Sequence, residues 1–230
     1  MSLMFLFRKT VHSITRPKLV ALMLLCACLA LVVVMVMVGG ITWGAAQLIT
    51  LEKGWLDTLI NWMAGIVLGI GGWFMLPVLV ILIAGAFQDT TIHRVESVEY
   101  PDEVRQGEPG FWPDVVHDIR FTLKALLLNI MVLPFYLIGI GFLLTVLLNS
   151  YLLGREFFES AAGYHLGKAD ARQLGRRNRK IVYGSGLMIT LISLMPFLNL
   201  FAPIVAIVWM VHLYHNLPNR PQTNLQTSPN

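Results

Sequence analysis

Charged residues are scarce in this 230-residue sequence, because Asp, Glu, Lys and Arg together make up only 13% of it. Soluble domains carry about 25% charged residues, so this chain has too few to cover a water-exposed surface. With 56% hydrophobic residues and a mean hydropathy of +0.68, the composition excludes an ordinary soluble enzyme, a nucleic-acid-binding module and a disordered chain. We therefore expect an all-α integral membrane protein.

Cysteines and catalytic motifs are also scarce. Only Cys26 and Cys28 are present, and on a helix they would point about 200° apart, which disfavours a disulfide or a shared metal ion. The sequence contains no Walker loop, nucleophile elbow, HExxH motif or clustered Cys/His spacing. We therefore expect no catalytic residues, no cofactor and no metal, and the protein is not expected to be an enzyme.

Four long stretches contain no Asp, Glu, Lys or Arg. They comprise 33, 31, 30 and 39 residues, at positions 19–51, 58–88, 125–154 and 181–219. A membrane-spanning helix needs about 20 apolar residues, so the first two stretches predict long transmembrane helices over 18–51 and 58–88. A cleaved signal peptide is the alternative for the first stretch, but its apolar run exceeds the ~7–15 residues usual for such a signal.

Proline, glycine and asparagine interrupt the third and fourth stretches. Each interruption leaves two halves that are too short to span a bilayer, so we expect re-entrant (hemi-penetrating) helix pairs over 125–154 and 181–217. The alternative is two continuous, kinked helices. Irregular backbone at membrane depth survives where protein or a water-filled cavity satisfies it, which suggests a polar pathway. The turn residues that would line this pathway are Gly139, Gly141, Pro196, Asn199 and Pro203, with Pro134 as a further break.

The basic residues favour the same topology. Seven of them lie in 155–180, and Lys and Arg concentrate on the cytoplasmic side of membrane proteins. We therefore assign both chain termini, segment 155–180 and segment 89–124 to the cytoplasm, the last as a polar loop with a new helix near Asp114. Residues 1–217 would form a single membrane domain. The polar tail 218–230 is expected to be disordered.

Ionisable side chains are few within the apolar stretches. None of the stretches contains an acidic residue, and His212 and His215 lie one helical turn apart near a predicted membrane exit. These histidines could share a ligand, or they could simply pack at the interface. Proton-coupled carriers keep an intramembrane Asp, Glu or His as a relay. The pattern therefore favours a passive conduit or a structural protein over a proton-driven pump.

A cationic cluster follows the third stretch. Residues 154–180 are amphipathic, so they predict a cytoplasmic surface helix that binds phospholipid headgroups or attracts anions. A purely topogenic role for these charges is the simpler alternative. The cationic residues of the cluster are Arg172, Arg176, Arg177 and Arg179.

Several strings resemble a known family. They are MPFLNLFAP at 195–203, NSYLLGREFF at 149–158, IGIG at 138–141, and Val95-Glu96 shortly before Tyr100-Pro101-Asp102. Together they resemble the CysZ family of sulfate permeases, also called the etoposide-induced-protein-like family. The resemblance extends from about Arg16 to His215.

The resemblance implies both a fold and a function. Members of this family have two spanning helices and two hemi-penetrating helix pairs, assemble as homo-oligomers, and carry sulfate across the bacterial inner membrane for cysteine synthesis. Their anion site near the start of the first helix corresponds here to Arg16 and Lys18. The family's glycine and adjacent arginine pair are replaced by Arg16-Pro17-Lys18, and Lys lacks the bidentate fork of Arg.

Two functional hypotheses follow. The first is a multi-pass inner-membrane anion permease or channel, with sulfate as the leading substrate and with the lipid bilayer and further copies of the same chain as partners. The alternative is a non-transporting scaffold, assembly factor or lipid-organising protein that keeps the same fold.

Overall fold

The computed structural model describes residues 3–48, 62–63, 65–66, 79, 83–104 and 111–221. The regular elements in these ranges are all helices, which confirms the all-α prediction. The α-helices are α1 (Leu3–Ile14), α2 (Pro17–Leu48), α4 (Gln88–Glu99), α5 (Phe111–Val132), α6 (Gly141–Leu166), α7 (Lys168–Arg177), α8 (Arg179–Ser193), α9 (Pro196–Asn199) and α10 (Ala202–His215), and the short 3-10 helices are η1 (Pro101–Glu103) and η2 (Leu133–Tyr136).

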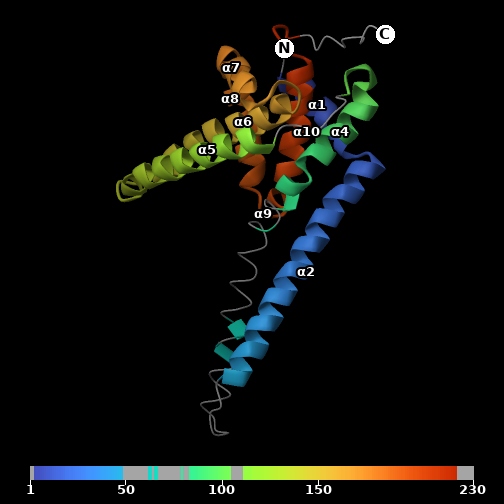
Figure 1. Ribbon diagram of the computed structural model, residues 1–230. Helices are drawn as coiled ribbons and strands as arrows, with labels where there is room; N and C mark the ends of the chain where they lie inside the picture. The colour runs from blue at the N-terminus through green and yellow to red at the C-terminus, as the bar shows by residue number, and fades with distance from the viewer. Residues whose placement is uncertain are drawn as a thin grey trace.

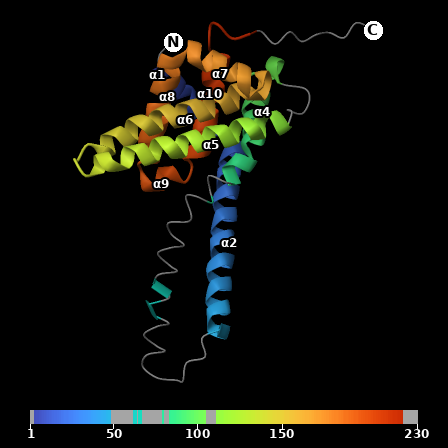
Figure 2. The ribbon, with the colours of Figure 1, turned by 60° about the vertical axis from the view of Figure 1, so that its left-hand side comes forward.

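Helix α2 is the long apolar rod that leaves the rest of the molecule in Figures 1 and 2. Pro17 occupies its first turn, where the missing N–H leaves no helical hydrogen bond unmade. Within the described part of the chain, Pro17–Trp43 is the one helix long and apolar enough to cross a membrane. Its 27 residues extend about 40 Å, more than the ~30 Å hydrocarbon core. The predicted second span, 58–88, lies largely outside the described residues.

The third uncharged stretch is a pair of helices rather than one kinked helix. Helix α5 ends at Val132, and Pro134 lies in the first turn of η2. Gly139 has φ +80°, a conformation that favours glycine. A Cβ on Gly141 would lie 2.6 Å from the backbone nitrogen of Tyr136. The chain therefore reverses here, and α5 and α6 lie side by side in Figures 1 and 2.

The fourth stretch also forms a pair of helices. Helix α8 ends at Ser193, Pro196 begins the single turn of α9, and Pro203 lies in the first turn of α10. The α9 turn lies at the end of the bundle from which α2 extends (Figure 2), whereas the α5–α6 pair lies across the direction of α2. The two helix pairs therefore differ in orientation.

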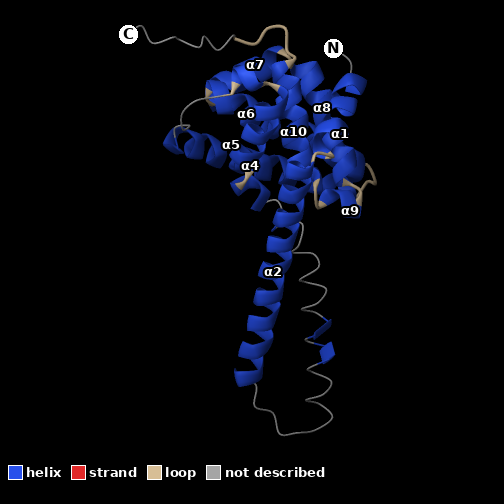
Figure 3. Cartoon of the chain, turned by 90° about the vertical axis from the view of Figure 1, so that its right-hand side faces the viewer, coloured by secondary structure: helices blue, strands red, loops and turns tan. Residues whose placement is uncertain are grey.

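Helix α10 forms the centre of the bundle (Figure 3), with α1, α4, α6 and α8 packed against it. Thirteen of its fourteen residues are buried. Beside it, α6 and α8 cross closely at two glycines. A Cβ on Gly186 would collide with the carbonyl oxygen of Ser150 and lie 2.7 Å from the Cα of Gly154, so this crossing requires glycine.

Two polar segments differ from their predicted form. The segment after residue 88 is helix α4 rather than a loop, because Ile92 and Val95 lie on one helical face and are buried in the core. Helix α6 continues to Leu166, well into segment 155–180, and Gly167 with φ +79° separates it from α7. Helices α5 and α6 are thus longer than the apolar halves alone.

Candidate functional site

The predicted anion-binding residues Arg16 and Lys18 line a pocket of about 340 Å³. The turn between α1 and α2 forms one side of this pocket, and α4 forms the other. The turn is closed by the Arg16 N–H, which donates to the Ser13 carbonyl oxygen at 3.1 Å. The first turn of α2 adds the positive end of the helix dipole, which favours an anion.

Arg94 is a third cation in this pocket that sequence reasoning missed. It comes from α4, and its Nη1 donates to the backbone carbonyl of Lys18 at 3.0 Å. The pocket lining contains these three cations and one acidic residue, Glu99, so the formal net charge of the pocket is +2. Reading residues 88–99 as a helix would have placed Arg94 and Val98 on one face, one turn apart.

Arg16 is only partly neutralised within the pocket. Its Nη2 lies 2.6 Å from Glu99 Oε1, with side chains 39% and 13% exposed respectively. Its Nε is buried and has no hydrogen-bond partner among the described residues. Leaving a buried charged donor unsatisfied is unfavourable, so the guanidinium keeps one donor that the described residues leave unsatisfied.

A buried polar cluster connects α4, α6 and α10. Glu96 Oε1 lies 2.6 Å from His165 Nε2 and 2.8 Å from His215 Nε2. Burial raises the pKa of Glu96, but hydrogen bonds and charge from the two histidines outweigh it, and the pKa is lowered. Sequence reasoning missed this cluster, because its members are far apart in the chain.

The two histidines of α10 have different hydrogen-bond partners. His212 contacts Ser13 Oγ through Nε2 at 2.9 Å and the Tyr100 hydroxyl through Nδ1 at 3.0 Å. His215 Nδ1 lies 2.8 Å from Glu103 Oε2. The two histidines thus have separate hydrogen-bond partners, although both rings lie against the ring of Tyr100.

The cluster also has the residue types of a metal site. The ligand atoms of Glu96, His165 and His215 lie within 4.8 Å of one another, and zinc accepts such ligands. However, both Nε2 atoms are within direct hydrogen-bond distance of one oxygen, Glu96 Oε1. The arrangement described is therefore a carboxylate held between two imidazoles.

Glu103 anchors the end of α10 to η1. It binds Arg220 by a bidentate contact in which Nη2 lies 2.6 Å from Oε1. This hydrogen bond is the main reason that the pKa of Glu103 is lowered to about 2, with a further contribution from His215. The contact joins the segment after α10 to η1.

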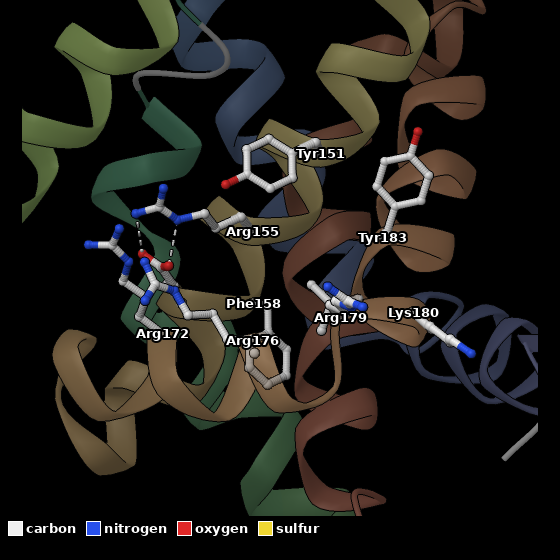
Figure 4. A pocket seen from close by; sticks show the side chains of 11 residues that line it. Tyr151, Arg155, Phe158, Arg172, Arg176, Arg179, Lys180 and Tyr183 are labelled. Carbon is white, nitrogen blue, oxygen red and sulfur yellow. Dashed lines mark hydrogen bonds and ion pairs between the residues drawn. The ribbon is translucent and has the colours of Figure 1, made fainter.

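Three of the four clustered arginines share a second pocket, which Figure 4 shows between α6, α7 and α8. Arg172 and Arg176 of α7 and Arg179 of α8 line it, together with Arg155 of α6 and Lys180 of α8. Arg177 is exposed and is not among the lining residues. Three of the four arginines therefore line one cavity, and Arg177 lies outside its lining.

The predicted turn residues occupy the two helix-pair tips. Gly139 and Gly141 lie at the α5–α6 tip, and α9 ends at Asn199 in the other. The two tips lie apart in Figures 1 and 2. None of these glycines, prolines or asparagines lines the two pockets described above, so the structure does not bring them together with Arg16 and Lys18.

Comparison with known proteins identifies the family. The model of the family described as Sulfate transporter CysZ/Etoposide-induced protein 2.4 matches residues 6–203. The chain belongs to this family. The CysZ match extends from α1 into the first turn of α10, so it includes both cationic pockets but ends before His212 and His215.

Membership makes this chain a membrane protein of a transporter-type family rather than of an enzyme family. It also confirms the resemblance to CysZ that the sequence strings indicated. No curated protein matches the chain.

Proposed function

We propose that the protein is an inner-membrane anion permease of the CysZ type, with sulfate as its leading substrate. The observation that carries this proposal is the buried Arg16 Nε, which has no hydrogen-bond partner among the described residues. It lies in a pocket with Lys18, Arg94 and a net charge of +2. An oxyanion would satisfy this donor and would lie beside the N-terminus of the spanning helix.

Arg94 supplies part of what the chain lacks at its first turn. The family's arginine pair is absent there, but α4 brings a second guanidinium to the same pocket. Guanidinium groups bind oxyanions through two parallel N–H donors, which a single ammonium group does not offer. Arg16 from the α1–α2 turn and Arg94 from α4 would therefore together reconstitute a two-arginine site.

Glu99 would act as the competing anion. It is bound to Arg16 when the pocket holds no other anion, so substrate must exchange with this carboxylate on the guanidinium. Such exchange keeps binding reversible, since the released cation has an alternative partner. Release is as necessary as capture in a conduit.

The topology we propose keeps both termini in the cytoplasm and lets α2 and segment 58–88 span the inner membrane. The pairs α5–α6 and α8–α10 enter the bilayer without crossing it. Exposed apolar side chains at the first tip support this, since Leu137 is 91% and Ile138 is 67% exposed. Such residues are stable in lipid rather than in water. We also expect a homo-oligomer that supplies sulfate for cysteine synthesis.

Uptake by proteoliposomes tests the proposal. Labelled sulfate should enter vesicles containing the wild-type protein, and the double variant Arg16→Ala/Lys18→Ala should lower uptake about 100-fold, since each hydrogen bond to a charged group contributes roughly 1.5–3 kcal/mol. Arg94→Ala should lower it about tenfold. Arg8→Ala removes an exposed cation of α1 outside the pocket and should have no effect.

The alternative is a non-transporting scaffold with the same fold. Two observations favour the scaffold. The family's arginine pair is replaced, and the one arginine that remains before α2, Arg16, already forms an ion pair with Glu99. Absence of both sulfate uptake and sulfate binding by the folded wild-type protein would support the scaffold. Undiminished uptake in the double variant would remove Arg16 and Lys18 from the mechanism.

A further inference from the structure

The second pocket, of about 360 Å³, contains an excess of positive charge. Its lining includes five cations and Glu159 as the acidic residue, a formal net charge of +4. In Figure 4, Arg172 and Arg176 lie toward Arg155, while Arg179 and Lys180 lie on the other side of Phe158. Cations from three helices therefore surround one cavity.

Among the residues that the structure describes, few side chains neutralise this charge. Arg155 Nε pairs with Glu159 Oε1 at 2.6 Å, and these side chains are only 12% and 6% exposed. The other four cations form no ion pair with any residue in the described ranges. Like charges held together repel one another, so this arrangement is stable when an anion lies among them.

The helix faces that lead from the pocket are apolar. On α6, residues Leu143, Leu147, Tyr151 and Arg155 follow one another at intervals of four, so they share one helical face. Leu143 is 60% exposed, and Leu147 and Tyr151 are each 41% exposed. The face thus changes from aliphatic to aromatic to cationic within four helical turns.

Helix α8 repeats this order in the opposite chain direction. Lys180 is followed by Tyr183, which is 36% exposed, and then by Leu191, which is 46% exposed. The Tyr183 hydroxyl donates to the Leu147 carbonyl oxygen at 3.4 Å, which holds the two faces side by side. Tyrosine prefers the membrane–water interface, with aliphatic residues on its lipid side and cations on its aqueous side.

The pocket is therefore amphiphilic. Phe158 and Val182 supply apolar lining between the cations, which an inorganic anion does not need. A ligand with a negative headgroup and hydrocarbon chains matches both parts, because the chains can follow the leucine faces. We propose that this pocket binds the phosphodiester headgroup of an anionic phospholipid, with its acyl chains along α6 and α8.

Competition binding in detergent micelles tests this site on the full-length protein. Phosphatidylglycerol should bind the wild type, whereas phosphatidylcholine, whose headgroup has no net charge, should bind at least tenfold more weakly. Arg176→Ala/Arg179→Ala should weaken phosphatidylglycerol binding about 25-fold, at roughly fivefold for each cation removed. Arg177→Ala is the matched control, because this neighbouring exposed cation does not line the pocket, and its binding should be unchanged.

Displacement by soluble anions and a lysine double variant provide two further tests of the proposal. Glycerol phosphate or inorganic sulfate, added at the lipid concentration, should not displace phosphatidylglycerol; displacement would indicate a free oxyanion site and overturn the proposal. Arg176→Lys/Arg179→Lys should keep most of the binding, which separates lost charge from lost folding. Equal binding of both lipids, or wild-type affinity in the alanine double variant, would also overturn it. All of these experiments measure lipid binding and none measures sulfate uptake, so their outcome is independent of the proposed transport function.

Discussion

The two cationic pockets differ in what surrounds their arginines. At the α1–α2 turn, Arg16 faces a carboxylate that can exchange with an incoming anion, and Lys18 and Arg94 lie nearby. Between α6, α7 and α8, five cations, of which Arg155 alone forms an ion pair within the described ranges, surround aromatic and aliphatic side chains. The first arrangement suits a small ion that must leave again, and the second suits an amphiphile that stays.

The largest expected effect is that substitutions in one pocket change sulfate uptake while substitutions in the other change phosphatidylglycerol binding. Arg16→Ala/Lys18→Ala should lower sulfate uptake about 100-fold and leave phosphatidylglycerol affinity unchanged. Arg176→Ala/Arg179→Ala should do the reverse in the same two assays, provided that the vesicles for uptake contain excess anionic lipid. If either double variant lowers both quantities equally, the two pockets form one functional site and the comparison fails.

The next effect concerns the glycine crossing that builds the second pocket. Gly186→Ala places a Cβ against the backbone of α6, so it should lower the free energy of unfolding by about 1–3 kcal/mol and reduce lipid binding. Thermal unfolding followed by tryptophan fluorescence measures this change.

Gly184→Ala is the matched control for the crossing. Its Cβ would lie 3.4 Å from the flexible Cδ1 of Leu3, which is ordinary contact, so the unfolding midpoint should stay within about 0.5 kcal/mol of wild type. A similar loss in both variants would show that the close approach of α6 and α8 is not what Gly186 provides.

Glu99→Gln sharpens the account of the first pocket. Removing the competing carboxylate frees Arg16, so the KM for sulfate uptake should fall several-fold while the second pocket is unaffected. Asp102→Asn removes an exposed acidic charge from η1 outside the pocket and serves as the control. A raised KM in Glu99→Gln would mean that Glu99 positions Arg16 for the anion rather than competing with it.

The smallest effect is a pH dependence away from both pockets. Because Arg220 lowers the pKa of Glu103 to about 2 from the usual 4.5, the folded protein binds fewer protons than the unfolded chain between these values. The stability that the pair contributes is therefore complete above pH 4.5 and is lost as the pH falls toward 2. The effect is modest because Glu103 is partly exposed.

Arg220→Gln tests this pH dependence. The variant should unfold at a lower temperature at pH 7, and its midpoint should fall less than that of the wild type between pH 5 and pH 3. Parallel pH curves for the two proteins would exclude the Glu103–Arg220 pair as the cause.

Sequence reasoning succeeded where the cause is local. Pro134 and Pro196 interrupt helices wherever they occur in an apolar run, so both helix pairs could be located before the structure was known. The length of the apolar helix α2 could likewise be predicted from its own residues. These features depend on neighbouring residues, and distant contacts do not change them.

The remainder depends on contacts between distant segments. Helix α4 was taken for a loop because its outward face is polar, and only burial of Ile92 and Val95 against α10 reveals it as a helix. Arg94 could not be assigned to the Arg16 pocket without that helix. Likewise, Arg176 and Arg177 are neighbouring arginines that the sequence alone does not distinguish. The packing of α7 on α6 decides that Arg176 lines the pocket and Arg177 does not.

The shared carboxylate of Glu96 has a mechanical consequence. It accepts hydrogen bonds from histidines on α6 and α10 at the same oxygen while α4 carries it, so separating any two of these helices would strand a charge away from water. The three helices must therefore move as one rigid body. Helix α2 takes no part in this carboxylate cluster, and its main contacts among the described helices are with α1 and α4.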